Sequence, residues 1–112
     1  MSPGKPRQQR RSFDAREIAA LDRTLHEPAR LSIAACLYVV DSADFVFLQG
    51  QTGMTGGNLS SHMKKLEDAG YVTVTKTFEN ARPKTTLRLN ADGRAAFARY
   101  IEALSTMLRA IT

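Results

Sequence analysis

Apolar positions near the start of the chain have helical spacing. A carboxylate pair, Asp14 and Glu17, precedes these positions and matches a capping box. The apolar residues lie at i, i+3 and i+7: Ile18, Leu21 and Leu25. This pattern predicts a first amphipathic helix near residues 14–25.

The next stretch is apolar nearly all round. Pro28 suits the first turn of a helix, because its missing N–H is not needed there. Residues 28–41 are therefore predicted to form the central buried helix. The short apolar run at residues 45–48 fits either a strand or a buried helical turn, since periodicity alone does not separate the two.

A third helix, near residues 55–69, is predicted to have one apolar and one polar face. Thr55 can cap its start, and Gly70 can end it. The apolar positions, spaced by four and then three residues, are Leu59, Met63 and Leu66. The opposite face carries Asn58, Ser61, Lys64, Lys65 and Asp68. The second half of this helix is basic.

Strict alternation follows and predicts a β-hairpin over about residues 71–89. The inward-facing apolar positions are Val72, Val74, Leu87 and Leu89. The segment at residues 78–84 contains Pro83 and is predicted to be the connecting loop. Arg82 and Lys84 would give this loop a basic tip.

The last helix is predicted over about residues 90–111, with Asn90 as its cap. Its apolar residues are spaced by four, three, four and three: Phe97, Ile101, Leu104, Leu108 and Ile111, with Tyr100 and Met107 alongside. This heptad-like seam lies on a helix longer than a small core needs, so we expect it to pack against a partner helix.

The net charge and its distribution along the chain indicate a class of binding partner. The 112 residues fit one domain, predicted to begin near residue 13 after a basic, disordered arm at residues 1–12. The formal net charge of +5 favours a polyanion. Residues 55–88 are also basic, whereas residues 17–54 are acidic, so the charge is divided into patches.

The order of elements predicts a winged helix-turn-helix: a mainly α fold with a small β-hairpin (α+β) and a long C-terminal dimerisation helix. A helix with a small polar outer face fits the major groove of DNA, and a basic hairpin can reach a minor groove or the backbone. Gly56 and Gly57 either let backbone N–H groups approach a phosphate or form only a loose helix start.

The residues also resemble a family. Residues 45–72, which include Gln-Thr-Gly-Met-Thr-Gly-Gly-Asn-Leu-Ser-Ser-His-Met-Lys-Lys-Leu, resemble the DNA-reading region of MarR/ArsR-type winged-helix transcriptional regulators. Residues 78–85 and 89–94 are similar to the wing and post-wing helix start of their small stand-alone subgroup. The resemblance covers roughly residues 14–104. It implies a homodimer that binds double-stranded operator DNA and regulates transcription, here as a repressor.

The resemblance implies DNA contacts for particular residues: Asn58, Ser60, Ser61, His62, Lys64 and Arg82. The residue pattern adds Thr55, Gly57, Lys65 and Lys84. The first and last helices would supply the dimer interface, through Ile18, Leu21, Leu25, Phe97, Tyr100, Ile101, Leu104, Met107, Leu108 and Ile111.

Several of these residues have a purely structural alternative. The two lysines of the third helix can be a solvated face. Ser60 can be half buried beside Leu59, and His62 can pack against the hairpin. Arg82 has no evident core role.

Other kinds of site are not expected. The candidate metal ligands Cys36, His26 and His62 are scattered, so no metal site or cofactor is predicted. The apolar neighbours of Cys36 predict a buried, inert thiol. A pocket for a small-molecule effector between the dimer helices and the core remains an alternative. The single cysteine and the absence of a signal or a long apolar run predict a cytoplasmic protein without a membrane segment.

Two classes of function follow. The main hypothesis is a sequence-specific DNA-binding transcriptional regulator. The alternative is a winged-helix protein–protein interaction module without sequence-specific DNA binding. An enzyme is not expected, because the chain has no Gly-rich phosphate loop, paired-carboxylate motif or nucleophile signature.

Overall fold

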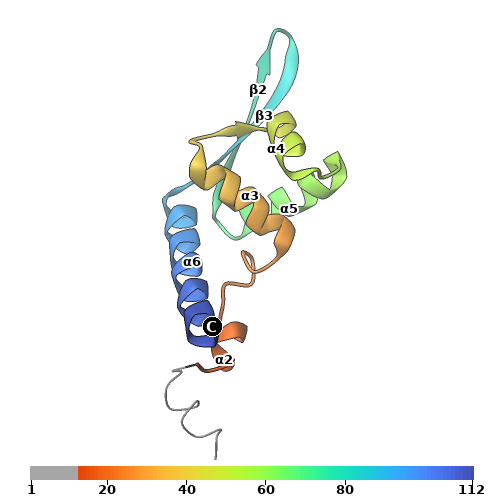
Figure 1. Ribbon diagram of the computed structural model, residues 1–112. Helices are drawn as coiled ribbons and strands as arrows, with labels where there is room; N and C mark the ends of the chain where they lie inside the picture. The colour runs from red at the N-terminus through yellow and green to blue at the C-terminus, as the bar shows by residue number, and fades with distance from the viewer. Residues whose placement is uncertain (1–12) are drawn as a thin grey trace, which may run out of the picture.

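The computed structural model describes residues 13–112 and has the predicted winged helix fold (Figure 1). The elements in chain order are α2 (Arg16–Ala19), α3 (Pro28–Val39), β1 (Ala43–Asp44), α4 (Phe45–Thr52), α5 (Gly56–Asp68), β2 (Val72–Glu79), β3 (Arg82–Leu89) and α6 (Ala91–Ile111). The strands pair antiparallel in the order β1-β3-β2. The predicted arm at residues 1–12 lies outside the described residues.

The first helix is much shorter than predicted. Only α2 is helical within residues 14–25, and the capping box is absent, since no side chain caps the start of α2. Asp22 explains the early end. Its carboxylate accepts hydrogen bonds from the backbone N–H groups of Thr24 and Leu25, at 2.9 and 3.1 Å. These bonds build a turn that competes with the next helical turn.

Helix α3 begins as predicted and is buried on one side. Pro28 occupies its first turn, and the Glu27 carboxylate accepts a backbone N–H bond of 2.8 Å at its start. The buried residues are Ile33, Ala34 and Leu37. Tyr38 and Val39 are exposed, so the expectation of a helix buried nearly all round is wrong for its C-terminal end.

The ambiguous run at residues 45–48 is helical and opens α4. The Asp44 carboxylate caps this helix with a hydrogen bond of 2.7 Å, which selects the helical alternative. Gly53, with φ 73°, ends α4 in the left-handed conformation. The Thr55 hydroxyl then accepts the N–H of Asn58 at 3.2 Å and starts α5. A tight turn therefore joins two capped helices.

The hairpin has longer strands and a tighter turn than predicted. The expected loop at residues 78–84 is wrong, because β2 continues to Glu79 and β3 begins at Arg82. Only Asn80 and Ala81 form the turn, with φ of 55° and 63°. Two central residues with positive φ match the twist of a two-residue hairpin. Arg82 therefore lies in a strand next to the turn, not in a loop.

The start of α6 is joined to the base of the hairpin. The Asn90 side chain caps α6 by accepting the Gly93 N–H at 2.8 Å. Its amide donates to the Gly70 carbonyl, and its backbone N–H donates to the Tyr71 carbonyl. A Cβ at position 93 would lie 2.0 Å from that Tyr71 oxygen. This close approach requires glycine.

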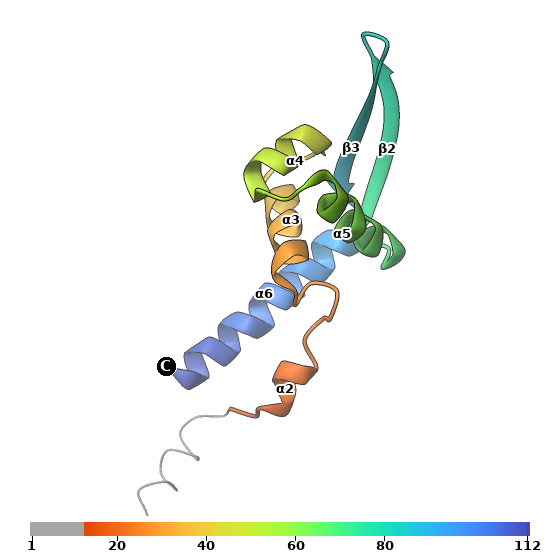
Figure 2. The ribbon, with the colours of Figure 1, turned by 90° about the vertical axis from the view of Figure 1, so that its right-hand side faces the viewer.

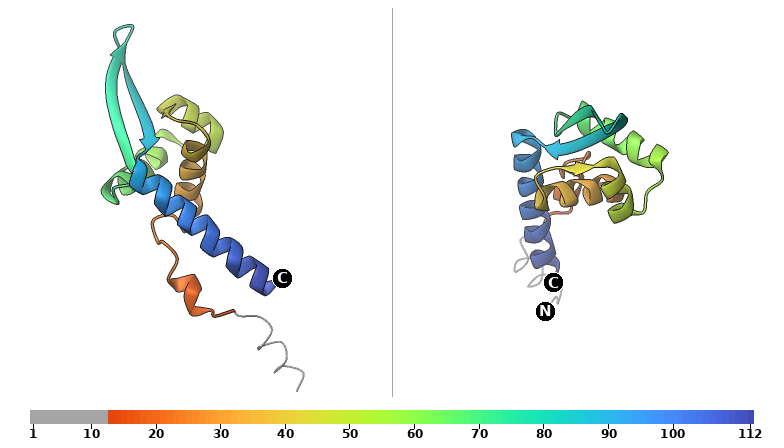
Figure 3. Two further views of the ribbon diagram at one scale, coloured as in Figure 1. Left: turned by 90° about the vertical axis from the view of Figure 1, so that its left-hand side faces the viewer. Right: turned by 90° about the horizontal axis from the view of Figure 1, so that it is seen from above.

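The core lies between α3, α4, α5 and the sheet, and includes Leu25, Ile33, Leu37, Leu48, Leu59, Leu66 and Leu87, all fully buried. Figure 2 shows the hairpin and the C-terminal half of α6 projecting from opposite ends of this core. Figure 3 shows α2 on the same side as the end of α6. The fold therefore separates one surface around α5 and the hairpin from another around α2 and α6.

Candidate nucleic-acid interface

Helix α5 presents the polar face that its sequence predicts. Its buried side is Leu59 and Leu66. Among the residues predicted to face DNA, those exposed on α5 or at its cap are Thr55, Gly57, Asn58, Ser60, Ser61, Lys64 and Lys65. Ser60 is thus exposed, and its half-buried alternative is wrong.

The two glycines at the start of α5 differ from Gly93. A Cβ on Gly57 would meet nothing within 4 Å, and one on Gly56 would make only ordinary contacts of 3.6 and 3.8 Å. Packing within the chain therefore gives no reason for glycine at position 57. The absence of a side chain at position 57 leaves the backbone N–H groups there accessible to an approaching group.

The two lysines of α5 are exposed, and interactions within the described part of the chain restrain them only weakly. Lys64 donates to Asp68 at 2.8 Å one turn later, and this bond raises the pKa of Lys64. Both side chains are largely exposed, and such a surface pair contributes little to stability. Lys65 has no ion pair within residues 13–112. Either ammonium group can therefore turn to an external anion.

His62 lies apart from this polar face. Its Nδ1 is 3.2 Å from a guanidinium nitrogen of Arg30 and 3.9 Å from a carboxylate oxygen of Glu27. An arginine only donates, so Nδ1 is the acceptor. The ring packs against α3, which corrects the alternative that placed it on the hairpin. His62 is half-buried, unlike the exposed residues of this face.

Arg30 was missed by the sequence analysis and positions α5. Besides contacting His62, its guanidinium donates to the backbone carbonyls of Thr24 at 2.6 Å and Arg23 at 3.4 Å. It therefore joins α5 to the turn before α3. No spacing rule signals this role, because His62 lies 32 residues away in sequence and the other two acceptors are backbone carbonyls.

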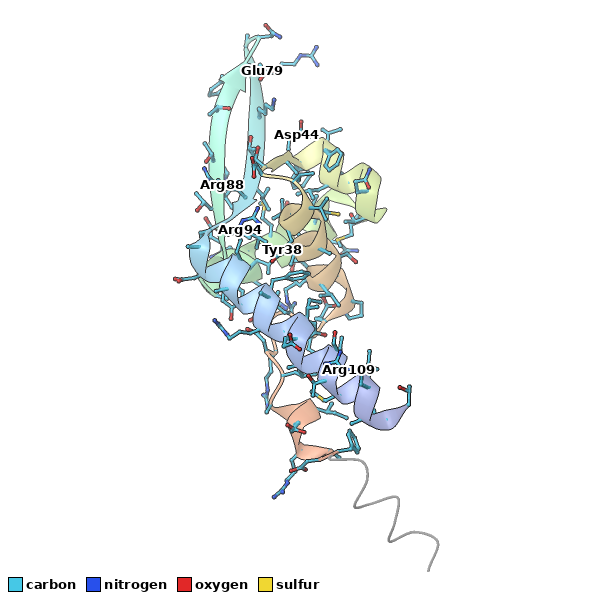
Figure 4. All side chains as sticks on the ribbon, turned by 60° about the vertical axis from the view of Figure 1, so that its left-hand side comes forward. Tyr38, Asp44, Glu79, Arg88, Arg94 and Arg109 are labelled. Atoms are coloured by element: carbon cyan, nitrogen blue, oxygen red, sulfur yellow. The ribbon has the colours of Figure 1, made fainter. Side chains whose placement is uncertain are left out.

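The hairpin carries three of its four basic residues, Arg82, Lys84 and Arg88, along β3. Arg82 is exposed and makes no ion pair in the described part of the chain. Lys84 donates to Glu79 at 3.0 Å, and this bond is the main cause of its raised pKa. Figure 4 shows Glu79 at the far end of the hairpin and Arg88 nearer the base.

A cleft of about 660 Å³ separates the hairpin from the helices. Ser60 and Met63 line it from α5, and Val46 lines it from α4. Lys76 faces it from β2 and was missed by the sequence analysis. The signal was present, since Lys76 continues the inward alternation of Val72 and Val74 beyond the core.

The charge of this surface is positive. Helix α5 and the hairpin carry six basic residues, Lys64, Lys65, Lys76, Arg82, Lys84 and Arg88, against three acidic residues, Glu67, Asp68 and Glu79. This excess, next to small polar side chains, suits a polyanion whose edges carry hydrogen-bonding groups.

The residues predicted for a dimer interface divide into two groups. Five are buried within the chain itself: Leu21, Leu25, Phe97, Tyr100 and Met107. Leu104 is half-buried. The exposed ones are Ile18 (43%), Ile101 (40%), Leu108 (52%) and Ile111 (50%). The predicted seam therefore serves the chain's own core along one edge and leaves the other edge open.

The remaining candidate chemistry is sparse. Cys36 is half-buried, so the prediction of a buried thiol is wrong. Within residues 13–112, no three His, Cys, Asp or Glu side chains cluster as metal ligands would. None of the helices in that range is long and apolar enough to span a membrane.

Sequence comparison connects this architecture to a family. Residues 29–108 match the family described as winged helix DNA-binding domain. An uncharacterized protein of Methanocaldococcus jannaschii is 39% identical over 72 residues, which make up 64% of this chain and 78% of that protein. The family match at residues 29–108 runs from α3 through most of α6 and so includes α5 and the hairpin.

Solved structures share the fold. A transcriptional regulator homologue from Pyrococcus horikoshii OT3 superposes with a TM-score of 0.76 and 29% identity, covering 80% of this chain and 89% of that one. A MarR family regulator from Silicibacter pomeroyi gives 0.58 and 20%, covering 85% and 59%. An ArsR family regulator gives 0.53 and 15%, covering 87% and 96%. The last two share the fold alone.

Proposed function

Because this chain belongs to the family of winged helix DNA-binding domains, we propose that it represses transcription as a homodimer bound to a two-fold-related operator. The resemblance to MarR/ArsR-type regulators is confirmed by the family match and by the regulators that share the fold.

One observation carries the proposal. Ser60 of α5 and the basic residues of the hairpin, Lys76, Arg82 and Lys84, border a single cleft. A helix in a major groove and a hairpin in the next minor groove must lie on either side of a sugar–phosphate backbone. In the proposed complex that backbone lies in the cleft, where Lys76 and Ser60 supply a cation and a hydroxyl.

The side chains divide between two roles. Asn58 and Ser61, short and exposed on α5, read base edges in the major groove. Lys64, Lys65 and Arg82 bind phosphates and set the register, since their charges carry no sequence information of their own. The backbone N–H groups near Gly57, where a Cβ would meet nothing within 4 Å, donate hydrogen bonds to a phosphate at the start of α5.

The proposed dimer uses the exposed edge of α6. Ile101, Leu108 and Ile111 lie on this edge, with Ile18 exposed on α2. Burying them against a second copy removes apolar surface from water. A two-fold dimer presents two α5 helices to half-sites about one helical turn apart, roughly 34–36 Å. Repression requires only that the bound dimer covers DNA that the polymerase must use.

A second cleft, of about 530 Å³ between α2 and α6, is the proposed place for a small-molecule effector. Leu21 and Met107 give it apolar walls, and Asp22 and Arg99 give it charge. Asp22 also holds Tyr71 at the base of the hairpin, so a ligand there would act on the DNA-binding surface.

The test is binding to the DNA just upstream of the protein's own reading frame. Fluorescence anisotropy with this duplex and with a scrambled duplex of equal length measures sequence preference. Hydroxyl-radical footprinting then measures the spacing of protected half-sites. We expect preferential binding and two footprints about one helical turn apart.

Matched variants connect the binding to the site. Lys64→Ala and Arg82→Ala should each weaken binding, whereas Arg109→Ala removes the same charge at the far end of α6 (Figure 4) and should not. Equal weak binding to both duplexes, unaffected by Lys64→Ala and Arg82→Ala, would contradict the proposal and favour a protein-interaction module.

A further inference from the structure

An exposed phenylalanine near the tip of the hairpin has no role in the fold. Phe78 is 77% exposed, although it is the largest apolar side chain of either long strand. It lies one pair from the turn, far along a hairpin that projects away from the core (Figure 1). A lone exposed apolar residue is ordinary on a protein surface, so its neighbours decide what it does.

The residue opposite Phe78 is also apolar. The register pairs Phe78 with Pro83, and the side chains of such a pair lie on one face of the hairpin. The turn is two residues long, so the Glu79–Arg82 pair closes it and the next pair makes no hydrogen bonds between the strands. Pro83 therefore removes no bond to β2, and the tip gains a rigid apolar face.

The charges around this face select its partner. Arg82, Lys84 and Lys76 lie within two residues of Phe78 or Pro83 along the hairpin, with Glu79 as the only acidic residue of either strand. Lys76 shares the face of the apolar pair, and Arg82 and Lys84 flank Pro83 on the opposite face. An apolar pair with cations on both sides of the hairpin suits a partner with apolar rings between two rows of anions. The minor groove of DNA has that chemistry, since deoxyribose rings form its walls and phosphates its rims.

We propose that the Phe78 ring packs against deoxyribose rings inside the minor groove, with Pro83 supporting it. This inference rests on the proposed function and adds an apolar, water-excluding contact to the electrostatic contacts of the hairpin. Arg82 on the opposite face of the same tip binds the phosphates, so one hairpin makes two physically different contacts.

The two contacts differ in their response to salt. A residue that neutralises a phosphate releases counterions, so its removal lowers the slope of log affinity against log salt. An apolar contact releases none. Loss of Phe78 should therefore lower the affinity by about tenfold or more at every salt concentration, as expected for a ring that leaves water, and keep the slope of the wild type.

The experiment compares three substitutions at position 78 by fluorescence anisotropy across a salt series. Phe78→Thr removes the apolar ring but keeps strand propensity, Phe78→Ala removes both, and Phe78→Leu keeps an apolar side chain. Val39→Ala is the control for an exposed apolar side chain outside the hairpin, because Val39 is 84% exposed at the end of α3. We expect losses of affinity for Thr and Ala, near-wild-type affinity for Leu, and no change for Val39→Ala.

The same series is repeated on an A·T-rich duplex loaded with netropsin, which fills the minor groove. Wild type and Phe78→Thr should then bind equally. A difference that persists with netropsin would overturn the proposal, as would Phe78→Thr binding like the wild type while Arg82→Ala weakens binding. If Phe78→Thr binds like the wild type while Arg82→Ala weakens binding, the proposed function remains intact. Failure of the wild type to bind any duplex contradicts both.

Discussion

The hydroxyl of Tyr71 donates a hydrogen bond to the carboxylate of Asp22, which joins the base of the hairpin to the turn before α3. The same carboxylate holds the backbone of that turn through Thr24 and Leu25. The bond, with burial and the charge of Asp22, raises the pKa of Tyr71 to about 12. Asp22 thus ends α2 early and also fixes where the hairpin begins.

Tyr71→Phe should lower the free energy of unfolding by about 1–2 kcal/mol at neutral pH, because a bond to a charged acceptor is lost and little packing changes. Urea unfolding followed by circular dichroism measures this. Thr77→Ala, at an exposed position of β2, is the control and should change it by less than about 0.5 kcal/mol. An unchanged midpoint for Tyr71→Phe would contradict the proposed link.

The same bond predicts a pH dependence. The folded pKa of Tyr71 lies above its ordinary value of 10, so the folded state keeps the phenol proton longer than the unfolded state does. Its contribution to stability is full below pH 10 and is lost as the pH rises towards 12. The stability difference between wild type and Tyr71→Phe should therefore shrink over this range. A difference that stays constant would show that the phenol proton is not involved.

Gly93→Ala should destabilise the protein severely, by several kcal/mol, or prevent folding. The new methyl group would lie 2.0 Å from the Tyr71 carbonyl oxygen and would push α6 from the hairpin. Gly50→Ala is the matched control in α4, where a Cβ meets nothing within 4 Å. It should stabilise by about 0.5–1 kcal/mol through helix propensity. Thermal unfolding of the two variants measures both effects, and equal midpoints would contradict the close approach.

Arg30→Met should lower the free energy of unfolding by about 2 kcal/mol. It keeps much of the side-chain volume but removes the donors to Thr24, Arg23 and His62. Arg23→Met is the control, since it removes an exposed cation and leaves the backbone carbonyl in place. Denaturant unfolding that ranks the two variants equally would show that Arg30 does not hold α5.

Leu108→Glu should convert the proposed dimer to a monomer, because it places a charge on the exposed apolar edge of α6. Ala95→Glu adds the same charge to an exposed position on another side of α6 and should leave the dimer intact. Sedimentation velocity at micromolar concentration measures the change. A wild type that sediments as a monomer would contradict the dimer.

Local patterns predicted most of the fold. Thr55, Asn90 and Pro28 mark helix starts that the structure reproduces, because caps act within one turn. The errors arose where a side chain acts over a longer distance or competes with the backbone. Asp22 ends α2 with hydrogen bonds that periodicity does not reveal, and the Asn80–Ala81 turn shortens a loop that Pro83 had suggested.

The candidate site was predicted in outline. The exposed face of α5 followed from spacing alone. The position of His62 did not, because its partner Arg30 is 32 residues away in sequence and only the packing of α5 on α3 brings them together. Lys76 could have been found by extending the alternation of β2, since side chains on a strand keep their face beyond the core.

In the proposed complex, α5 and the hairpin both contact the same DNA duplex. The most direct test is the salt dependence of anisotropy on the upstream duplex for wild type, Arg82→Ala and Lys64→Ala. We predict a steep slope for the wild type and a slope smaller by about one unit for each variant, since each loses one phosphate contact. If Arg82→Ala or Lys64→Ala bound with the affinity and slope of the wild type, the hairpin or α5, respectively, would not contact DNA.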